Sequence, residues 1–239
     1  MTELAFGADA SLDNVMRTMR AMRRLKPDPV PRELLTQLVE AATYAPSGGN
    51  AQTYSYVVVD DREQMAQFAP IWQRIQRWYV TTQTPPPHMS ADEWSATMRA
   101  LEYQAEHFAE TPAIIVPCYE VRDAVRRTMK TVDKQRAGMR LLGARKVAGM
   151  TRNMPKFVNT GVTASVYPSV QNLLLMARAL GLGATLTTWH TLFEHEVKAV
   201  LGIPRHVHTY AIIPIGYPKG NFGPVKRRPA DEAIHWDRW

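Results

Sequence analysis

The sequence is short of the residues that build cross-linked or membrane-spanning proteins. Cys118 is the single cysteine among 239 residues, which excludes an internal disulfide framework and a cysteine-based zinc cage. No run of about 18 apolar residues occurs, so we expect no membrane-spanning helix. Met1 to Asp13 contains acidic residues and no apolar stretch of useful length, so we expect no secretory signal and a cytoplasmic protein.

Several site motifs are absent or misspaced as well. No Gly-x-Gly-x-x-Gly pattern follows a strand-like segment and no Walker loop occurs, which disfavours a doubly wound dinucleotide-binding fold. His190, Glu194 and His195 are spaced one residue wider than the inverted zinc-protease motif, which disfavours a metal site. We interpret Glu194 as the start of a helix and Cys118 as an inert core residue.

The composition is that of a globular protein with a basic surface. Hydrophobic residues make up 45% of the chain and charged residues 21%, so the chain can bury enough apolar surface to fold. The formal net charge of +7 favours an anionic partner without naming one. A basic nucleic-acid-binding protein is therefore one functional class to weigh.

The hydrophobic pattern alternates between helical spacing and short stretches rich in β-branched and aromatic residues. Several helices around a few strands with long connections indicate a single α+β domain over residues 1–239. We expect helices near 12–19, 31–44, 63–79, 94–108, 166–180 and 194–201, strands at 54–60, 113–119 and 208–216, and an extended segment at 184–189.

Residues 120–156 differ from the rest of the chain. They contain eleven Lys or Arg and three Asp or Glu, a local balance of +8. Their helical patterning is weak and glycines interrupt it. We interpret this segment as a variable excursion or lid, and not as a separate domain.

Two basic clusters lie near opposite ends of the chain. The first spans Arg17 to Lys26 and includes Arg20 and Arg23, and the second is Lys226 to Arg228. Each is either a solvated face or an anion site, since the planar fork of arginine matches phosphate oxygens. The loop 46–50 likewise is either a helix stop or a tight loop that packs small polar groups against a flat ligand.

Six segments carry motifs that are specific when taken jointly: 20–31, 40–52, 179–183, 201–204, 215–218 and the basic tail through Arg228-Pro229 to His235-Trp236. In this order, across most of the chain, they resemble the nitroreductase family, the FMN-dependent NAD(P)H oxidoreductases. The resemblance does not cover the segment from about Trp72 to Thr160.

The resemblance implies a nitroreductase-like α+β fold with a central mixed, mainly antiparallel sheet flanked by helices. It also implies an intertwined homodimer with two FMN sites at its interface. Loop residues would come from the other subunit, and both basic clusters would converge on one phosphate. The implied cofactor-binding residues are Arg20 and Arg23 for phosphate and ribityl, Lys226 and Arg228 for phosphate, Pro46, Ser47, Gly48 and Asn50 from the partner, Ser165 as a polar contact, and Leu186, Thr187, Thr188 and Trp189 along the ring near N5.

The implied chemistry belongs to the flavin, with no side chain as an obligatory acid or base. NAD(P)H would deliver hydride to N5 and leave, and a nitroaromatic or quinone would then take the electrons. Arg23 would supply charge near the N1–C2=O edge. Other flavin chemistry on the same fold, such as reductive dehalogenation or flavin fragmentation, is the alternative.

The sequence departs from the family pattern at the proposed site. Ala21 stands where serine is usual, and Thr187-Thr188-Trp189 replaces a glycine-containing segment. No Glu-x-x-x-Tyr lid motif followed by lysine is present, which disfavours an iodotyrosine deiodinase. Within the basic segment, we expect Arg126, Arg127 and Lys130 to attract the phosphates of NAD(P)H or an acidic acceptor; the alternative is a solvated basic surface.

Overall fold

The fold is built on a five-stranded sheet. The computed structural model describes residues 6–7, 10–120, 122 and 132–239. The strand order is β1-β2-β5-β3, β4 also pairs with β2, and all these pairings are antiparallel. The predicted α+β class and mainly antiparallel sheet are therefore confirmed. The strands are β1 (Tyr54–Val59), β2 (Ala113–Glu120), β3 (Gly183–Ala184), β4 (Val207–Thr209) and β5 (Ile213–Gly216).

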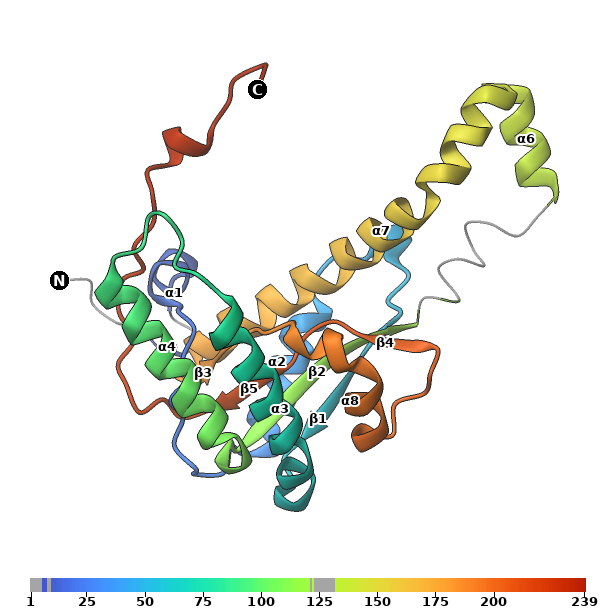
Figure 1. Cartoon of the computed structure of the whole chain (residues 1–239). Coiled ribbons are helices and arrows are strands. Elements are labelled where there is room, and N and C mark those ends of the chain that lie inside the picture. The colour runs from blue at the N-terminus through green and yellow to red at the C-terminus, as the bar shows by residue number, and fades with distance from the viewer. Residues whose placement is uncertain (1–5, 8–9, 121, 123–131) are drawn as a thin grey trace.

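Helices cover both faces of this sheet (Figure 1). Two of them begin at side-chain N-caps: Ser11 accepts from the backbone N–H of Asn14, and Ser90 forms a capping box with Glu93. The helices are α1 (Leu12–Thr18), α2 (Arg32–Thr43), α3 (Arg62–Thr82), α4 (Ala91–Glu106), α6 (Val132–Leu142), α7 (Ala144–Ala179) and α8 (Glu194–Leu201), with 3-10 turns η1 (Gly48–Asn50), η2 (Phe108–Glu110), η3 (Trp189–Phe193) and η4 (Ala230–Ala233).

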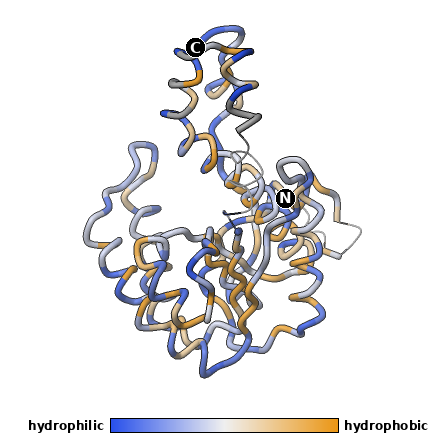
Figure 2. The backbone as a smooth tube through the Cα atoms, turned by 90° about the vertical axis from the view of Figure 1, so that its right-hand side faces the viewer, coloured by the Kyte–Doolittle hydropathy of each residue, from blue (hydrophilic) through white to orange (hydrophobic). Residues whose placement is uncertain are grey.

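The central strand β2 is buried on both faces and separates two cores. Ile115 packs with α2 and α7, whereas its neighbours Ile114 and Val116 pack with α3. Consecutive side chains of a strand point to opposite faces, so one apolar run serves both layers. Figure 2 shows the hydrophobic residues gathered in the interior of the body.

The helix α7 is much longer than predicted. It begins at Ala144 and not near Val166, and runs for 36 residues. Its first half stands away from the body together with α6, so few of its described side chains pack against anything before Val162 (Figure 1). Without a buried face there is no apolar periodicity to detect, which explains the missed start.

The expected strand over 208–216 is instead two short strands, β4 and β5. Their pairings with β2 differ by one residue in register, because three residues, 210–212, face the two residues 116–117. Pro117 accepts a hydrogen bond from the backbone N–H of Tyr210 at 3.0 Å but has no N–H to return. The ladder is interrupted there by a bulge.

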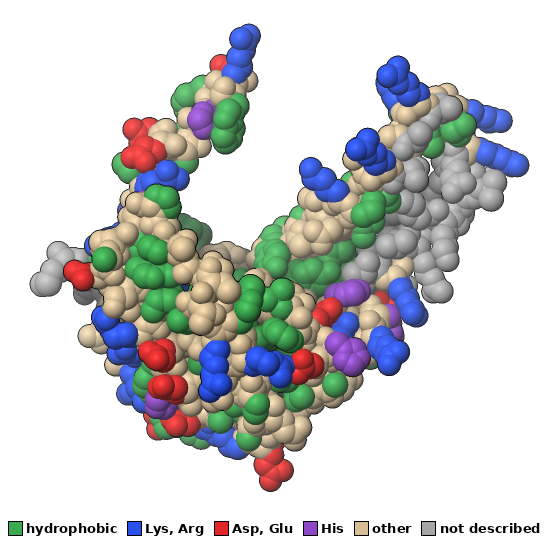
Figure 3. Space-filling view, viewed as in Figure 1, with side chains coloured by type: hydrophobic (Ala, Val, Ile, Leu, Met, Phe, Trp, Pro, Cys, Tyr) green, Lys and Arg blue, Asp and Glu red, His purple; other side chains and the backbone are tan. Residues whose placement is uncertain are grey.

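The described part of the basic segment is a helical hairpin made of α6 and the start of α7. Figure 3 shows its Lys and Arg side chains at the end farthest from the sheet. Arg126, Arg127 and Lys130 lie outside the described residues. Within the part of the chain that is described, no helix is long and apolar enough to cross a membrane.

Candidate functional site

The two basic clusters lie side by side. The tail after β5 runs antiparallel to the segment that follows α1, with Leu25 and Pro218 paired in an isolated bridge. The backbone N–H of Lys26 donates to the Tyr217 carbonyl at 2.8 Å, and that of Val225 donates to the Arg17 carbonyl at 2.8 Å. The structure thus places side by side the two segments that the family resemblance implies lie together.

Glycine is needed where these segments meet the sheet. A Cβ atom on Gly183 would lie 2.9 Å from Leu25 Cδ2 and 2.9 Å from Met22 Cβ. No side chain fits at that distance, so the glycine of β3 allows the basic segment to pack against the strand.

A cavity of about 210 Å³ lies beneath the paired segments. Arg20, Arg178 and Arg227 line it, from three separate parts of the chain. Among the described residues that form its wall there is no Asp or Glu. The guanidinium groups in this wall make the cavity suited to an anion such as phosphate. We call it the arginine cavity; its other lining residues are Met19, Ala21, Leu174, Leu182, Ala184, Thr185, Leu186 and Phe222.

Two of the predicted phosphate ligands do not line this cavity. Lys226 Nζ lies 3.0 Å from Glu93 Oε1, and Arg228 lies 3.9 Å from Glu232; both basic side chains are exposed. The hydrogen bonds of Glu93 to Ser90 and to Lys226 lower the pKa of its carboxyl to about 2. Arg227, the residue between them, faces the cavity, and sequence reasoning missed it because a run of three cations does not indicate which one turns inward.

Arg23 occupies a different, largely buried position next to Tyr79. Burial lowers the pKa of its guanidinium. Its Nε is enclosed and has no hydrogen-bond partner within the described chain.

Trp189 is held over Tyr79 by a close aromatic stack. The two ring centroids are 3.7 Å apart with an interplanar angle of 25°, and Trp72 lies 6.4 Å from Trp189 on the same side. The stack fixes the start of η3 against α3. Tryptophan at this departure from the family pattern therefore has a clear structural partner.

The predicted segment 186–189 links the arginine cavity to this stack. Leu186 lines the cavity, and Thr187 is fixed by two backbone hydrogen bonds with Ile212, of 2.9 and 3.1 Å. Thr188 precedes η3 with φ −117° and ψ 0°. Three residues of chain span at most about 10 Å, so the arginine cavity and the aromatic stack lie within roughly that distance along this segment.

The loop 46–50 and Ser165, two other predicted site elements, contact each other within the chain. The backbone N–H of Gly48 donates to Ser165 Oγ at 3.1 Å, and that hydroxyl donates to the Gly161 carbonyl. Ser47 Oγ accepts from the N–H of Gln52, and Asn50 has a φ of 52°. Pro46 begins this turn. Ser165 thus holds the 46–50 loop on α7.

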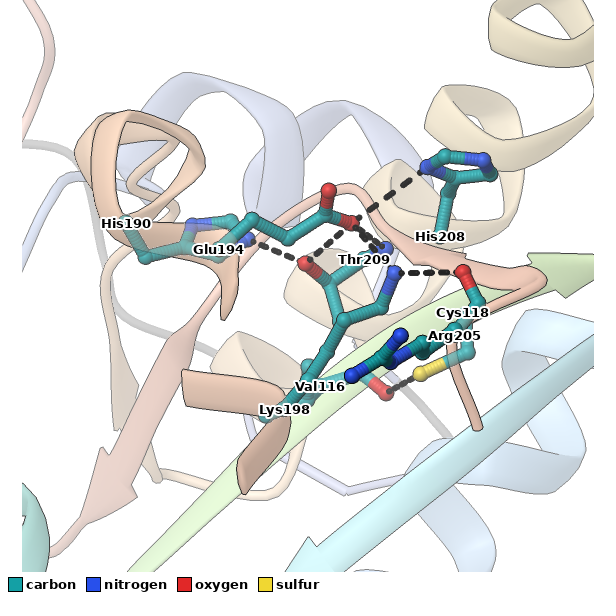
Figure 4. A network of polar contacts seen from close by, with 8 residues as sticks. All are labelled: Val116, Cys118, His190, Glu194, Lys198, Arg205, His208 and Thr209. Carbon is teal, nitrogen blue, oxygen red and sulfur yellow. Dashed lines mark hydrogen bonds and ion pairs between the residues drawn. The ribbon is translucent and has the colours of Figure 1, made fainter. Parts of the chain in front are cut away.

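His190 belongs to a buried polar network that ties η3 to β4 (Figure 4). Its Nε2 lies 3.0 Å from Thr209 Oγ1, and Glu194 Oε1 accepts from the Thr209 backbone N–H at 2.8 Å. Burial lowers the pKa of His190 to about 4. Lys198 and His208 lie 3.5 and 3.6 Å from the Glu194 carboxylate.

The structure places the remaining candidates, Cys118 and His195, outside the arginine cavity and the aromatic stack. Cys118 is buried in β2, and burial raises the pKa of its thiol to about 11, so the prediction of a core residue is confirmed. His195 is exposed on α8. The described side chains include no group of three His, Cys, Asp or Glu arranged to hold a metal.

Comparison with known families identifies the fold. The nitroreductase family model matches residues 16–217. The chain belongs to the nitroreductase family. The matched nitroreductase region ends just before the tail, so the position of Arg227 at the arginine cavity comes from the structure.

Several known proteins are similar to this nitroreductase-family chain. NADH dehydrogenase of Thermus thermophilus is 28% identical over 226 residues, which cover 91% of each chain. Iodotyrosine deiodinase of Daphnia pulex is 23% identical over 226 residues, covering 92% of this chain and 64% of that longer protein. An iodotyrosine deiodinase solved with FMN and 3-iodo-L-tyrosine has a TM-score of 0.65 at 18% identity, covering 96% of this chain and 100% of that one. At this identity the structural similarity shows the fold alone.

Proposed function

We propose that this chain is an FMN-dependent oxidoreductase that transfers electrons from NAD(P)H to a nitroaromatic or quinone-type acceptor in a ping-pong reaction. One observation carries the proposal: a single segment, 186–189, joins the arginine cavity to a stacked aromatic surface beside the half-buried Arg23. FMN has a phosphate and a flat ring in one molecule. When bound, FMN supplies the redox chemistry itself.

The chain's own residues fit that cofactor. Arg20 and Arg227 would hold the phosphate in the arginine cavity. Arg23 would donate to the electron-rich edge of the flavin, where positive charge stabilises the reduced ring. The backbone of Thr187 and Thr188 would lie along the ring, fixed by the bridge to Ile212.

We further propose a homodimer with the FMN sites at its interface. An apolar groove of about 620 Å³ lies between α1, α2 and α7, with Tyr44 and Leu180 in its wall. Leu12 and Tyr44 are large apolar side chains left 62% and 73% exposed, which is typical of surfaces covered by a second subunit. The partner's loop 46–50 would complete the site with Pro46, Ser47, Gly48 and Asn50. The tail extends away from the body and would reach that partner, where Lys226 and Arg228 would act (Figure 1).

Reductive dehalogenation is the second candidate. It is supported by the similarity to iodotyrosine deiodinases in sequence and fold. NAD(P)H oxidation with a quinone, a nitroaromatic and a halotyrosine as acceptors separates the two candidates. If the halotyrosine supports NAD(P)H oxidation and the other two acceptors do not, the result favours dehalogenation.

The flavin content of the purified protein tests FMN binding, which both candidate functions require. We expect a yellow protein with a flavin absorption band, one FMN per chain and a dimer in sedimentation. A colourless protein that takes up no added FMN, yet binds DNA with a steep salt dependence, would instead support the nucleic-acid-binding class.

A further inference from the structure

Two exposed leucines lie at the turn of the basic helical hairpin. Leu141 is 82% exposed and Leu142 is 43% exposed, at the end of α6. Gly143 makes the turn with a left-handed φ of 76°, and its N–H donates to the Met139 carbonyl at 3.1 Å. The helix α7 begins at the next residue. We call residues 140–146 the hairpin tip.

The hairpin holds this tip far from the hydrophobic core. A Cβ atom on Gly138 would lie 3.8 Å from Val147 Cγ2, so α6 and α7 run close together just behind the tip. On α7, eighteen residues separate Ala144 from Val162, the first side chain of this helix described as buried, which is about 27 Å of helix. Figure 1 shows the hairpin standing away from the body. The leucines of the tip therefore face water, and not the core of their own chain.

The apolar tip is also strongly basic. Arg140, Arg145 and Lys146 flank the two leucines and are exposed. Residues 132–160 contain seven Lys or Arg and a single acidic residue, Asp133. Figure 3 shows cationic side chains at this end of the hairpin. The tip thus offers positive charge and apolar side chains to the same partner.

This combination is typical of segments that lie in the headgroup region of an anionic bilayer. Apolar side chains there enter the boundary between headgroups and acyl chains, while Lys and Arg reach back to the lipid phosphates. A nucleic acid would neutralise the cations, but it would leave the leucines in water. A second basic tip would repel the first. The tip is a convex point, and a bilayer accommodates such a point without a preformed pocket.

We propose that the hairpin tip docks reversibly on the surface of a lipid bilayer that contains anionic headgroups. Leu141 and Leu142 enter the boundary of the acyl chains, and the three cations of the tip bind lipid phosphates. In this arrangement the chain lies on one side of the bilayer. The inference goes beyond the proposed function and does not depend on bound FMN.

Cosedimentation with vesicles tests the docking. One set of vesicles is pure phosphatidylcholine, and the other contains about one third phosphatidylglycerol as the anionic lipid. We expect the wild-type protein to bind the anionic vesicles and to stay in solution with phosphatidylcholine alone. The bound fraction should fall as salt rises, because the attraction to the headgroups is screened.

A charge variant tests the role of the basic side chains. It replaces the three cations of the tip together by glutamine, and we expect its partition onto anionic vesicles to fall about a hundredfold, since each cation near such a surface contributes about fivefold. The matched control removes the same number of charges from exposed positions of the body. It replaces Arg77, Arg99 and Arg205 by glutamine, and its partition should stay within about threefold of wild type.

An apolar variant tests the insertion of the leucines. Leu141→Ser combined with Leu142→Ser should lower the partition at least about tenfold, whereas Leu192→Ser, at a leucine 57% exposed on η3, should not. Insertion is also observed directly. Leu141→Cys is labelled with an environment-sensitive fluorophore, which reacts there selectively because Cys118 is buried. We expect its emission to shift to the blue with anionic vesicles only.

Several results would overturn the docking. They are equal binding to both kinds of vesicle, wild-type partition in either tip variant, and an unshifted emission of the label. Binding to a short DNA duplex without binding to vesicles would assign the cations to nucleic acid instead. Vesicle binding by a protein that takes up no FMN would overturn the proposed function and leave the docking in place, and FMN uptake without vesicle binding would do the reverse.

Discussion

The ring of Trp189 stacks on the ring of Tyr79 with their centroids 3.7 Å apart, which connects η3 to α3 directly beside the buried Arg23. The stack lies at one end of the 186–189 segment, and the arginine cavity lies at the other. The packing of one half-buried tryptophan therefore holds the end of the segment that lies beside Arg23.

Replacing Trp189 tests that dependence. We expect Trp189→Ala to lower the free energy of unfolding by about 2–3 kcal/mol, since it loses buried area and the stack, and to weaken FMN binding as well. Trp189→Phe should retain most of both. Trp78→Ala, at an exposed tryptophan next to Tyr79 on α3, is the control, and its FMN affinity should match wild type. Urea unfolding and flavin titration give the two readouts. Full FMN affinity in Trp189→Ala would show that the stack does not contribute to FMN binding.

Arg227 and Arg228 form a natural comparison within the tail. Arg227 lines the arginine cavity, whereas Arg228 lies near Glu232. We expect Arg227→Ala to weaken FMN binding by about 1.5–3 kcal/mol, the range for a lost charge-assisted hydrogen bond, and Arg228→Ala to have a smaller effect. Calorimetric titration of both variants decides between them. The reverse order would place Arg228 at the phosphate, as the sequence alone predicts.

Ser165 should contribute to stability through the 46–50 loop. Ser165→Ala removes the acceptor of the Gly48 N–H, and we expect it to cost about 0.5–1.5 kcal/mol of unfolding free energy. Thr163→Ala is the control, because Thr163 is half-buried and the hydrogen bonds of its hydroxyl stay within α7. Hydrogen exchange at Gly48 should quicken in the first variant alone. An unaltered exchange rate would mean that the loop is held by other contacts.

The buried His190 predicts a stability that falls in mild acid. Its pKa is about 4 in the folded protein against 6.5 as the ordinary value, so below pH 6.5 the unfolded chain binds more protons. The corresponding stability is present above pH 6.5 and is lost as the pH falls toward 4, by at most about 3 kcal/mol. His190→Gln should flatten this part of the profile in urea unfolding, whereas His195→Gln, on the exposed face of α8, should not. A wild-type slope in His190→Gln would assign the acid sensitivity to other groups.

Salt should affect the reaction through the basic hairpin. Arg140, Arg145 and Lys146 are exposed near its turn, and such charges act over a Debye length of about 10 Å at 0.1 M salt. We expect the bimolecular rate of flavin reduction by NAD(P)H to fall as salt rises, and the triple glutamine variant to flatten that dependence with FMN still bound. Stopped-flow reduction at several salt concentrations measures it. A wild-type salt slope in the triple variant would show that these charges do not steer the reductant.

Local signals in the sequence predict the packed elements well. The apolar run at 113–119 identifies the strand β2, and the helical spacing over 31–44 identifies α2. The early start of α7 is not predictable in this way, because an exposed helix has no apolar periodicity. The division of 207–216 depends on Pro117 in the neighbouring strand, a partner that no local pattern reveals.

The segments of the candidate site were predictable, but not all of the residues that line it. Arg20 was expected at the phosphate and does line the cavity, yet Arg178 and Arg227 were not among the expected residues. Arg178 sits on an apolar helix face, where spacing gives no reason to single out one cation. Arg227 is distinguished from its neighbours only by the direction of its side chain.

The antiparallel pairing of the tail with the segment after α1 imposes an order on folding during synthesis. The arginine cavity needs residues 19–21, 178–186 and 222–227 at once, so the ribosome must deliver nearly the whole chain before the cavity exists. The body of the sheet, which is complete by Gly216, can form earlier. A nascent chain would therefore acquire its hydrophobic core first and its capacity to retain an anionic cofactor last, and proteolytic trimming of the tail would remove that capacity while leaving the core intact.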